Sequence, residues 1–375
     1  MAEITRNSIL NDRHKALGSK LDAEWNGMPL PQTYDTDPDD EVVAVRTKAG
    51  LFDVSALNML NVTGPDAAAA LDQMLTSNIA AMSAGQSAIS NIVDENGSLI
   101  DDVLIYCDGP ETFRVSHGGG ALEEVIDGFF KGKDAKWEKD DDVHILSLQG
   151  PLSLDILNPH TPYDLKALAY FKHAPTELFG KPVSIGRGGY SAELGYEVFC
   201  SAADAVFLWD EILKAGAPHG AIPVSWACLD IVRVEGALLF FPYDMPEGDT
   251  TPWEVGADWT VDLDKPDFHG KAALVRRKDE IRVAQVGVEI DTLGVVEPGA
   301  EIVKDGRTIG TVNSTAYSRY LMKSLGLAHV KPGLSALGTS VEVKTPDGML
   351  PAHIVRTPFY DPLRFRTHPK SERVA

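Results

Sequence analysis

Two adjacent carboxylates, Asp101 and Asp102, stand in a segment that otherwise has the composition of a β-strand. Asp94–Gly97 precede them, and Asn96 with Gly97 is a favoured pair for two residues at positive φ, which predicts a hairpin. Successive side chains of a strand point to opposite faces, so we expect the two carboxylates on opposite faces, each among apolar neighbours. Asp is depleted in strands, and a desolvated carboxylate is costly unless it is hydrogen-bonded or paired.

Two interpretations of this carboxylate pair are open. Inward-facing charges can protect an edge strand from aggregation or end its pairing, which is a purely structural role. Alternatively, apolar surroundings tune the pKa of one carboxyl group for acid–base chemistry. The hairpin alone favours the structural role, so the rest of the chain must decide.

Two glycine-rich segments could also approach a ligand. Phe113–Gly120 reads as a strand that ends in three glycines before a helix, where the backbone could hold an anion, although glycines at such turns are more often only turn residues. In Gly186–Phe199, alternation from Tyr190 predicts a strand, bulged at a glycine, that carries aromatic and acidic side chains. A solvated hairpin is the alternative for this second segment.

Three aromatic residues, Tyr243, Trp253 and Trp259, lie in an acidic stretch. Aromatic rings beside carboxylates can enclose an organic cation, but the same composition also lines ordinary core edges, which we favour. No histidine pair has ligand spacing on a helix, and the sequence has no Walker or dinucleotide phosphate loop. No metal site is therefore predicted.

The elements that must position these groups change character along the chain. From about residue 42 to 280, strands alternate with amphipathic helices, such as Ala67–Leu75 and a helix that Ser201 and Asp204 would cap and Gly216 would end. Beyond about 281, short alternating strands surround the turns Asp305-Gly306 and Asp347-Gly348. The pattern predicts an α+β region followed by a small C-terminal β-barrel.

Composition excludes several classes of protein. The 375 residues include 34 Lys and Arg against 55 Asp and Glu, a net charge of −21 that disfavours nucleic acid and anionic membranes as partners. No apolar run is long enough for a membrane helix, and the first 25 residues lack a secretory signal. Three scattered cysteines do not make a disulfide framework. We therefore expect a cytoplasmic protein.

Seven segments together resemble motifs of the folate-dependent family that includes the glycine cleavage T-protein, dimethylglycine-oxidising enzymes, dimethylsulfoniopropionate demethylase and certain aromatic O-demethylases. They occur in family order over nearly the whole chain: Ala44–Ser55, Asp94–Tyr106, Leu148–Pro151, Gly188–Phe199, Leu229–Leu238, Asp267–Leu274 and Arg356–Pro362. The resemblance implies a three-domain ring around a central tetrahydrofolate. Its parts would be two interleaved ferredoxin-like α+β domains, roughly 1–55 with 145–280 and 56–144, and a β-barrel over 281–375.

The resemblance also implies roles for individual residues, and it favours a functional carboxylate at Asp102, beside the reacting region of the folate. Tyr243 is the candidate acid if a phenolate must be protonated. The expected cofactor-binding residues are Leu104, Tyr106, Tyr190, Glu197 and Arg364. The expected substrate-binding residues are Trp253, Asp101 and His117, with Asp101 the weaker partner for the folate because it points to the opposite strand face.

Departures from the family pattern distinguish this chain from T-proteins. Ala56 replaces a His, Leu229 replaces an Arg, and an Asn of the third strand is replaced near Ser116 and His117. Loss of that Arg leaves the folate glutamate tail to other arginines: Arg356, Arg364 or Arg366.

We therefore expect a tetrahydrofolate-dependent demethylase that moves a methyl group from a small N-, S- or O-methylated compound to N5, giving 5-methyltetrahydrofolate. An onium substrate is slightly preferred, because its leaving group departs neutral and needs no acid. An aminomethyltransferase of glycine cleavage and a non-catalytic folate-binding protein are the alternatives. A homo-oligomer remains open.

Overall fold

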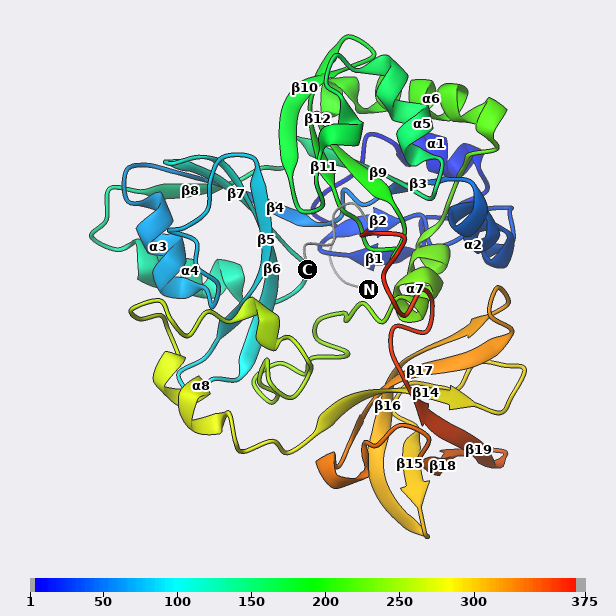
Figure 1. The fold of residues 1–375 in the computed structure, drawn as a ribbon. Helices are drawn as coiled ribbons and strands as arrows, with labels where there is room; N and C mark the ends of the chain where they lie inside the picture. Colours follow the sequence, from blue (N-terminus) through cyan, green and yellow to red (C-terminus); the bar gives the residue numbers. More distant parts are fainter. Residues whose placement is uncertain (1–3, 369–375) are drawn as a thin grey trace. The chain divides into compact units, whose positions relative to one another are not determined.

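The computed structural model describes residues 4–368 (Figure 1). The chain divides into two compact units. Unit 1 contains the chain up to Met59, Asp140–Arg233 and the chain from Leu363 onward. Unit 2 contains Leu60–Lys139 and Val234–Pro362. Because unit 2 includes both a sheet and a barrel, this division does not test the domain limits expected from the sequence.

Unit 1 is built on a six-stranded sheet with the order β10-β11-β12-β9-β3-β13. Neighbouring strands are antiparallel except for the parallel pair β3 and β13. The strands are β3 (Gly50–Asp53), β9 (Val143–Gln149), β10 (His173–Leu178), β11 (Lys181–Arg187), β12 (Gly195–Ser201) and β13 (Ile222–Pro223), and a separate hairpin joins β1 (Ala23–Trp25) to β2 (Met28–Leu30). The helices are α1 (Asn11–Ala16), α2 (Pro38–Thr47), α5 (Ser153–Leu157), α6 (Ala202–Gly216) and the short η1 (Asn158–His160), η2 (Leu165–Ala167) and η3 (Ala217–His219).

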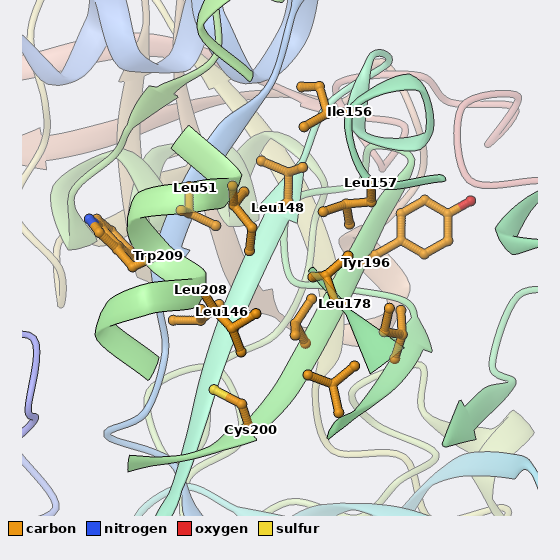
Figure 2. Packing of buried hydrophobic residues seen from close by; sticks show 14 of the residues in the cluster. Leu51, Leu146, Leu148, Ile156, Leu157, Leu178, Tyr196, Cys200, Leu208 and Trp209 are labelled. Carbon is orange, nitrogen blue, oxygen red and sulfur yellow. The ribbon is translucent and has the colours of Figure 1, made fainter. Parts of the chain in front are cut away.

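Helix α6 supplies much of the core of unit 1. Leu208 and Trp209 come from this helix and pack with Leu146 and Leu148 of β9, all with almost no exposed surface (Figure 2). The helix has the predicted limits, but the predicted capping box is wrong: the hydroxyl of Ser201 contacts the carboxylate of Asp204 at 3.4 Å and caps no backbone N–H.

Unit 2 contains a five-stranded sheet with the order β5-β6-β7-β4-β8. Its strands are β4 (Asn58–Thr63), β5 (Gln86–Val93), β6 (Leu99–Gly109), β7 (Thr112–His117) and β8 (Lys136–Lys139), and its helices are α3 (Ala67–Met74) and α4 (Leu122–Phe130). Leu71 of α3 and Ile126 of α4 share one buried cluster with Val103 and Ile105 of β6. Both helices therefore cover the same face of β6.

The β5–β6 hairpin is confirmed, but its turn differs from the prediction. Gly97 has a φ of 78°, whereas Asn96 is not among the residues at positive φ. The carboxylate of Asp94 accepts hydrogen bonds from the backbone N–H groups of Asn96 and Ser98, at 2.9 and 2.8 Å. This Asx-type turn holds Asn96 at negative φ, so one left-handed residue is enough.

The C-terminal strands close into a barrel with the order β14-β17-β16-β15-β18-β19, as predicted (Figure 1). They are β14 (Ala284–Ile290), β15 (Glu301–Lys304), β16 (Arg307–Ser318), β17 (Lys323–Val330), β18 (Ser340–Thr345) and β19 (Gly348–Val355), with η5 (Pro332–Leu334) between them. Asp305 and Gly306 both have positive φ, which suits a two-residue hairpin. Three further helices precede the barrel: α7 (Trp226–Glu235), η4 (Asp258–Thr260) and α8 (Lys271–Arg277). Among residues 4–368, no helix is long and apolar enough to cross a bilayer.

Candidate active site

Strand β6 carries both aspartates, and they lie on opposite faces as predicted. Asp101 is fully buried because it alternates in step with the core residues Val103 and Ile105, on the face covered by α3 and α4. Asp102 points to the other face and stands opposite Asn91 of β5 in the ladder. Only Asp102 is therefore outside the helix-covered core.

The carboxyl group of Asp102 has an unusual pKa. Burial raises this pKa to about 7, and the negative charge of Asp101 next to it adds to the increase. The charge of His117 and the backbone N–H of Asp102 oppose the shift without cancelling it. A carboxyl group that titrates near neutral pH can both donate and accept a proton, which is what acid–base chemistry requires.

Two of the predicted cofactor-binding residues follow Asp102 along the same strand. Leu104 is half-buried and Tyr106 is buried. The guanidinium carbon of Arg114 lies 5.0 Å from the centre of the Tyr106 ring, and Asp108 holds that guanidinium with two hydrogen bonds of 2.8 and 2.9 Å.

Asp101 and His117, both predicted to bind substrate, contact protein groups instead of an open surface. Nδ1 of His117 lies 3.2 Å from Oδ2 of Asp101, and Nε2 lies 3.3 Å from Oε1 of Glu123. Nζ of Lys139 contacts the same Glu123 oxygen at 2.9 Å. These four side chains, Asp101, His117, Glu123 and Lys139, thus form a continuous relay of charged contacts from β6 through β7 and α4 to β8.

The three-glycine segment does place an anion at a helix start, and that anion belongs to the protein. The backbone N–H of Leu122, the first residue of α4, donates to Oδ2 of Asp101 at 3.0 Å. A Cβ atom on Gly120 would overlap the carboxylate of Asp101. The close approach of Asp101 therefore requires a glycine at position 120.

Replacing this glycine should be costly. We expect Gly120→Ala to destabilise the protein by about 1–3 kcal/mol, because the extra methyl group overpacks a buried carboxylate that anchors α4. Gly128→Ala is the matched control: it lies in α4, where a Cβ would meet no neighbour, so the change should stabilise the helix by roughly 0.5–1 kcal/mol. Urea unfolding of both variants measures the difference, and equal effects would contradict it.

The prediction of a strand starting at Tyr190 is wrong. Gly188–Leu194 form a loop between β11 and β12, and Glu197 lies within β12. Gly189 and Gly195 both lie against the side-chain amide of Gln149, where a Cβ would overlap it, and Gly189 has a φ of 143°. These two close approaches turn the chain into a loop before the ladder can begin.

A buried ion network holds this loop, and sequence reasoning missed it. Arg46 is fully buried; it donates to the carbonyls of Ser191 and Val232 at 2.6 and 3.1 Å and lies 3.6 Å from the carboxylate of Glu193. Arg366, near the C-terminal end of the described chain, contacts the other oxygen of Glu193 at 3.2 Å. Arg366, one of the arginines considered for the folate tail, is thus bound to the loop of unit 1.

The remaining predicted residues do not form one aromatic cage. Tyr243 is exposed and stacks on Phe240, whereas Trp253 packs at the edge of a buried cluster and donates to the carbonyl of Leu274 at 3.0 Å. Trp253 and the exposed Trp259 line a cavity of about 620 Å³. The ammonium of Lys278 already lies 5.7 Å from the centre of the Trp253 ring. Arg364 is exposed in unit 1.

The signals for the missed residues were weak. Glu123 lies six positions after His117, beyond the glycines, and Arg46 sits in an ordinary helical stretch. Nothing in that spacing indicates which partner each will meet after folding.

Within the described part of the chain, no three His, Cys, Asp or Glu side chains gather in a way that would hold a metal ion.

Comparison with known families defines the class of protein. Residues 10–265 match the GCVT N-terminal domain, and residues 284–361 match the glycine cleavage T-protein C-terminal barrel domain. The chain belongs to the glycine cleavage T-protein family, whose members bind tetrahydrofolate as a cosubstrate. The resemblance noted in the sequence is therefore confirmed.

Individual relatives carry more than one function. The chain is 41% identical over 372 residues to the "Heme-dependent oxidative N-demethylase gamma subunit" of Ectopseudomonas mendocina, covering 96% of this chain and 98% of that one. It is 32% identical over 350 residues to an aminomethyltransferase of Halothermothrix orenii, covering 92% and 97%. The crystal structure of the glycine cleavage aminomethyltransferase from Bartonella henselae has the same fold, with a TM-score of 0.87 at 23% identity over 95% of this chain and 98% of that one.

Proposed function

We propose that this chain is a tetrahydrofolate-dependent enzyme that removes a one-carbon unit from a small methylated amine. The proposal is carried by the position of Asp102 on the face of β6 opposite the helices, where burial raises the pKa of its carboxyl group to about 7. A relative 41% identical over nearly the whole chain bears the name of an N-demethylase subunit, and that name supports a nitrogen-bound methyl group over sulfur or oxygen.

The residues present fit a reduced pterin. Asp102 can hold or release a proton at its Oδ atoms beside the apolar side chain of Leu104, which suits a flat heterocycle with polar N–H edges. Bound tetrahydrofolate would supply the nucleophilic nitrogen that accepts the one-carbon unit. In this proposal Asp102, Leu104 and Tyr106 of unit 2 hold the folate.

The chain's own contribution is orientation and proton control. The carboxyl group of Asp102 stabilises positive charge when it is ionised and donates a proton when it is neutral. Holding donor and acceptor together removes much of the entropic barrier to transfer. Tyr243 is exposed, and an amine leaving group gives it no phenolate to protonate.

The oxidation level of the carbon separates two forms of this reaction. The name of one relative contains the word "oxidative". Oxidative removal of an N-methyl group takes two electrons from that group and leaves the carbon at the level of formaldehyde, so this form requires an electron acceptor outside this chain. Formaldehyde and tetrahydrofolate then condense to 5,10-methylenetetrahydrofolate with loss of water. The direct transfer expected from the sequence instead gives 5-methyltetrahydrofolate.

Product analysis tests the proposal. The purified chain is incubated with tetrahydrofolate and either ¹³C-labelled formaldehyde or ¹³C-methyl amines, and mass spectrometry identifies the labelled folate. We expect labelled 5,10-methylenetetrahydrofolate from formaldehyde faster than the spontaneous reaction, with Asp102→Asn near the spontaneous rate. Labelled 5-methyltetrahydrofolate from an amine supports direct transfer. No labelled folate above background, with folate still bound by calorimetry, contradicts both and leaves a binding protein.

An aminomethyltransferase of glycine cleavage is the second candidate, because relatives of that name are 31–33% identical over most of the chain. Such an enzyme takes its carbon from a lipoylated carrier protein. Turnover with an aminomethylated carrier, and none with formaldehyde, would favour this candidate.

A further inference from the structure

The relay formed by Asp101, His117, Glu123 and Lys139 has no part in the function proposed above. Asp101 and His117 have almost no exposed surface, and Glu123 and Lys139 lie at the outer end of the relay, each about a third exposed. A structural ion pair needs two partners, whereas this arrangement connects four groups from four elements. The inner end of this relay is Asp101, the residue next to Asp102.

His117 lies between two carboxylates. Nε2 hydrogen-bonds to the carboxylate of Glu123 at 3.3 Å, and Nδ1 lies 3.2 Å from the carboxylate of Asp101 without hydrogen-bond geometry. A neutral imidazole has one N–H, so it would turn a lone pair toward one of the two carboxylates. Only the doubly protonated ring places an N–H toward each of them. Burial alone would lower the pKa of His117, but the two carboxylates outweigh burial and raise it.

The two carboxylate oxygens of Asp101 have different surroundings. Its Oδ2 atom receives the Leu122 N–H and faces His117, whereas Oδ1 is buried without a hydrogen-bond partner. An unsolvated carboxylate oxygen acts strongly on its surroundings, because no solvent screens it. The nearest titratable group along the strand is Asp102.

We infer that His117 is a positioning residue that controls the proton on Asp102, acting through its ion pair with the buried Asp101. A cationic His117 balances Asp101 and leaves Asp102 free to ionise. A neutral His117 leaves the charge of Asp101 unbalanced and holds the proton on Asp102. The charged groups facing this relay are Asp101 and Asp102 of β6, Glu123 of α4 and Lys139 of β8. Its catalytic meaning rests on the proposed function, but the coupling itself does not.

Coupled titration in the wild-type protein tests the coupling without folate or a methyl donor. The carboxyl carbon of Asp102 and the ring nitrogens of His117 are followed by NMR between pH 4 and about 9. Strongly interacting groups titrate in shared macroscopic steps, so we expect both signals to show the same two inflections. A single, separate midpoint for each residue would overturn the inference. This measurement needs no variant to fold.

Two substitutions give shifts of opposite sign. His117→Asn removes the cation and should raise the midpoint of Asp102 by roughly one pH unit, whereas Asp101→Asn removes the anion and should lower it by a similar amount. Glu111→Gln is the control, because it removes a carboxylate from the exposed turn at the far end of the β6–β7 hairpin and should shift nothing. Shifts of one sign in both substitutions, or none, would contradict the inference.

The pH profile of turnover tests whether the coupling between His117 and Asp102 affects catalysis. If folate turnover is found, its acid–base midpoints should move with the Asp102 midpoint in His117→Asn, while folding and the folate dissociation constant stay close to wild type. If no turnover is found at all, the function fails and the NMR result still decides the coupling. A loss of activity without any movement of the pH profile would give His117 a structural role only.

Discussion

Asp102→Asn should lower one-carbon transfer to tetrahydrofolate by about 10²- to 10⁴-fold, because the amide cannot exchange a proton or carry negative charge. The backbone of β6 and the buried Asp101 are unchanged, so folding should be preserved. Single-turnover rates at saturating folate measure the effect. Glu111→Gln, a loss of the same charge at the far end of the hairpin, should keep wild-type rates. Near-normal turnover of Asp102→Asn would show that this carboxyl group is not the catalytic one.

The same substitution should change how stability depends on pH. The carboxyl pKa of Asp102 is about 7 in the folded chain, against 3.8 for an unperturbed Asp, so between these values the folded state binds more protons than the unfolded state. The favourable contribution is complete below about pH 4 and is lost as pH rises through 7. Asp102→Asn should therefore match wild type near pH 4 and melt at a higher temperature at pH 8. The same difference in melting temperature between variant and wild type at both pH values would contradict the raised pKa.

Arg46→Met should have the largest effect on folding. It removes the buried cation that faces Glu193 and donates to the Ser191 and Val232 carbonyls, and breaking a buried pair from one side costs about 3–5 kcal/mol. The loop Gly188–Leu194 would lose its main support. Urea unfolding monitored by tryptophan fluorescence gives the free-energy difference.

Two controls distinguish charge from size in this experiment. Arg13→Met removes an arginine from the exposed pair with Asp210, so its effect should be small. Adding Glu193→Leu to Arg46→Met removes the buried carboxylate that has lost its contact with Arg46, and it should restore part of the lost stability, because the other partner, Arg366, is itself partly exposed. A double variant less stable than Arg46→Met would mean that the buried carboxylate is not the source of the cost.

Local sequence signals predicted the elements well where one short stretch contained the whole signal. The helix from Ala67, the hairpin around Asp94 and the turn at Asp305 are each fixed by spacing or by backbone preferences within a few residues. The loop at Tyr190 was assigned to a strand because its alternation was visible, whereas Gln149, whose amide lies against Gly189 and Gly195, is about 40 positions away in the chain.

By itself the sequence determined the α+β order of elements, the C-terminal barrel, the family and the opposite orientation of Asp101 and Asp102, because strand alternation and turn preferences act between neighbours. Only the tertiary structure decided that Asp101 and His117 pair with each other and that Glu123 and Lys139 extend this relay of side chains. Charge pairing and desolvation act through space, so the pKa of Asp102 depends on groups from β6 and β7 that packing brings together.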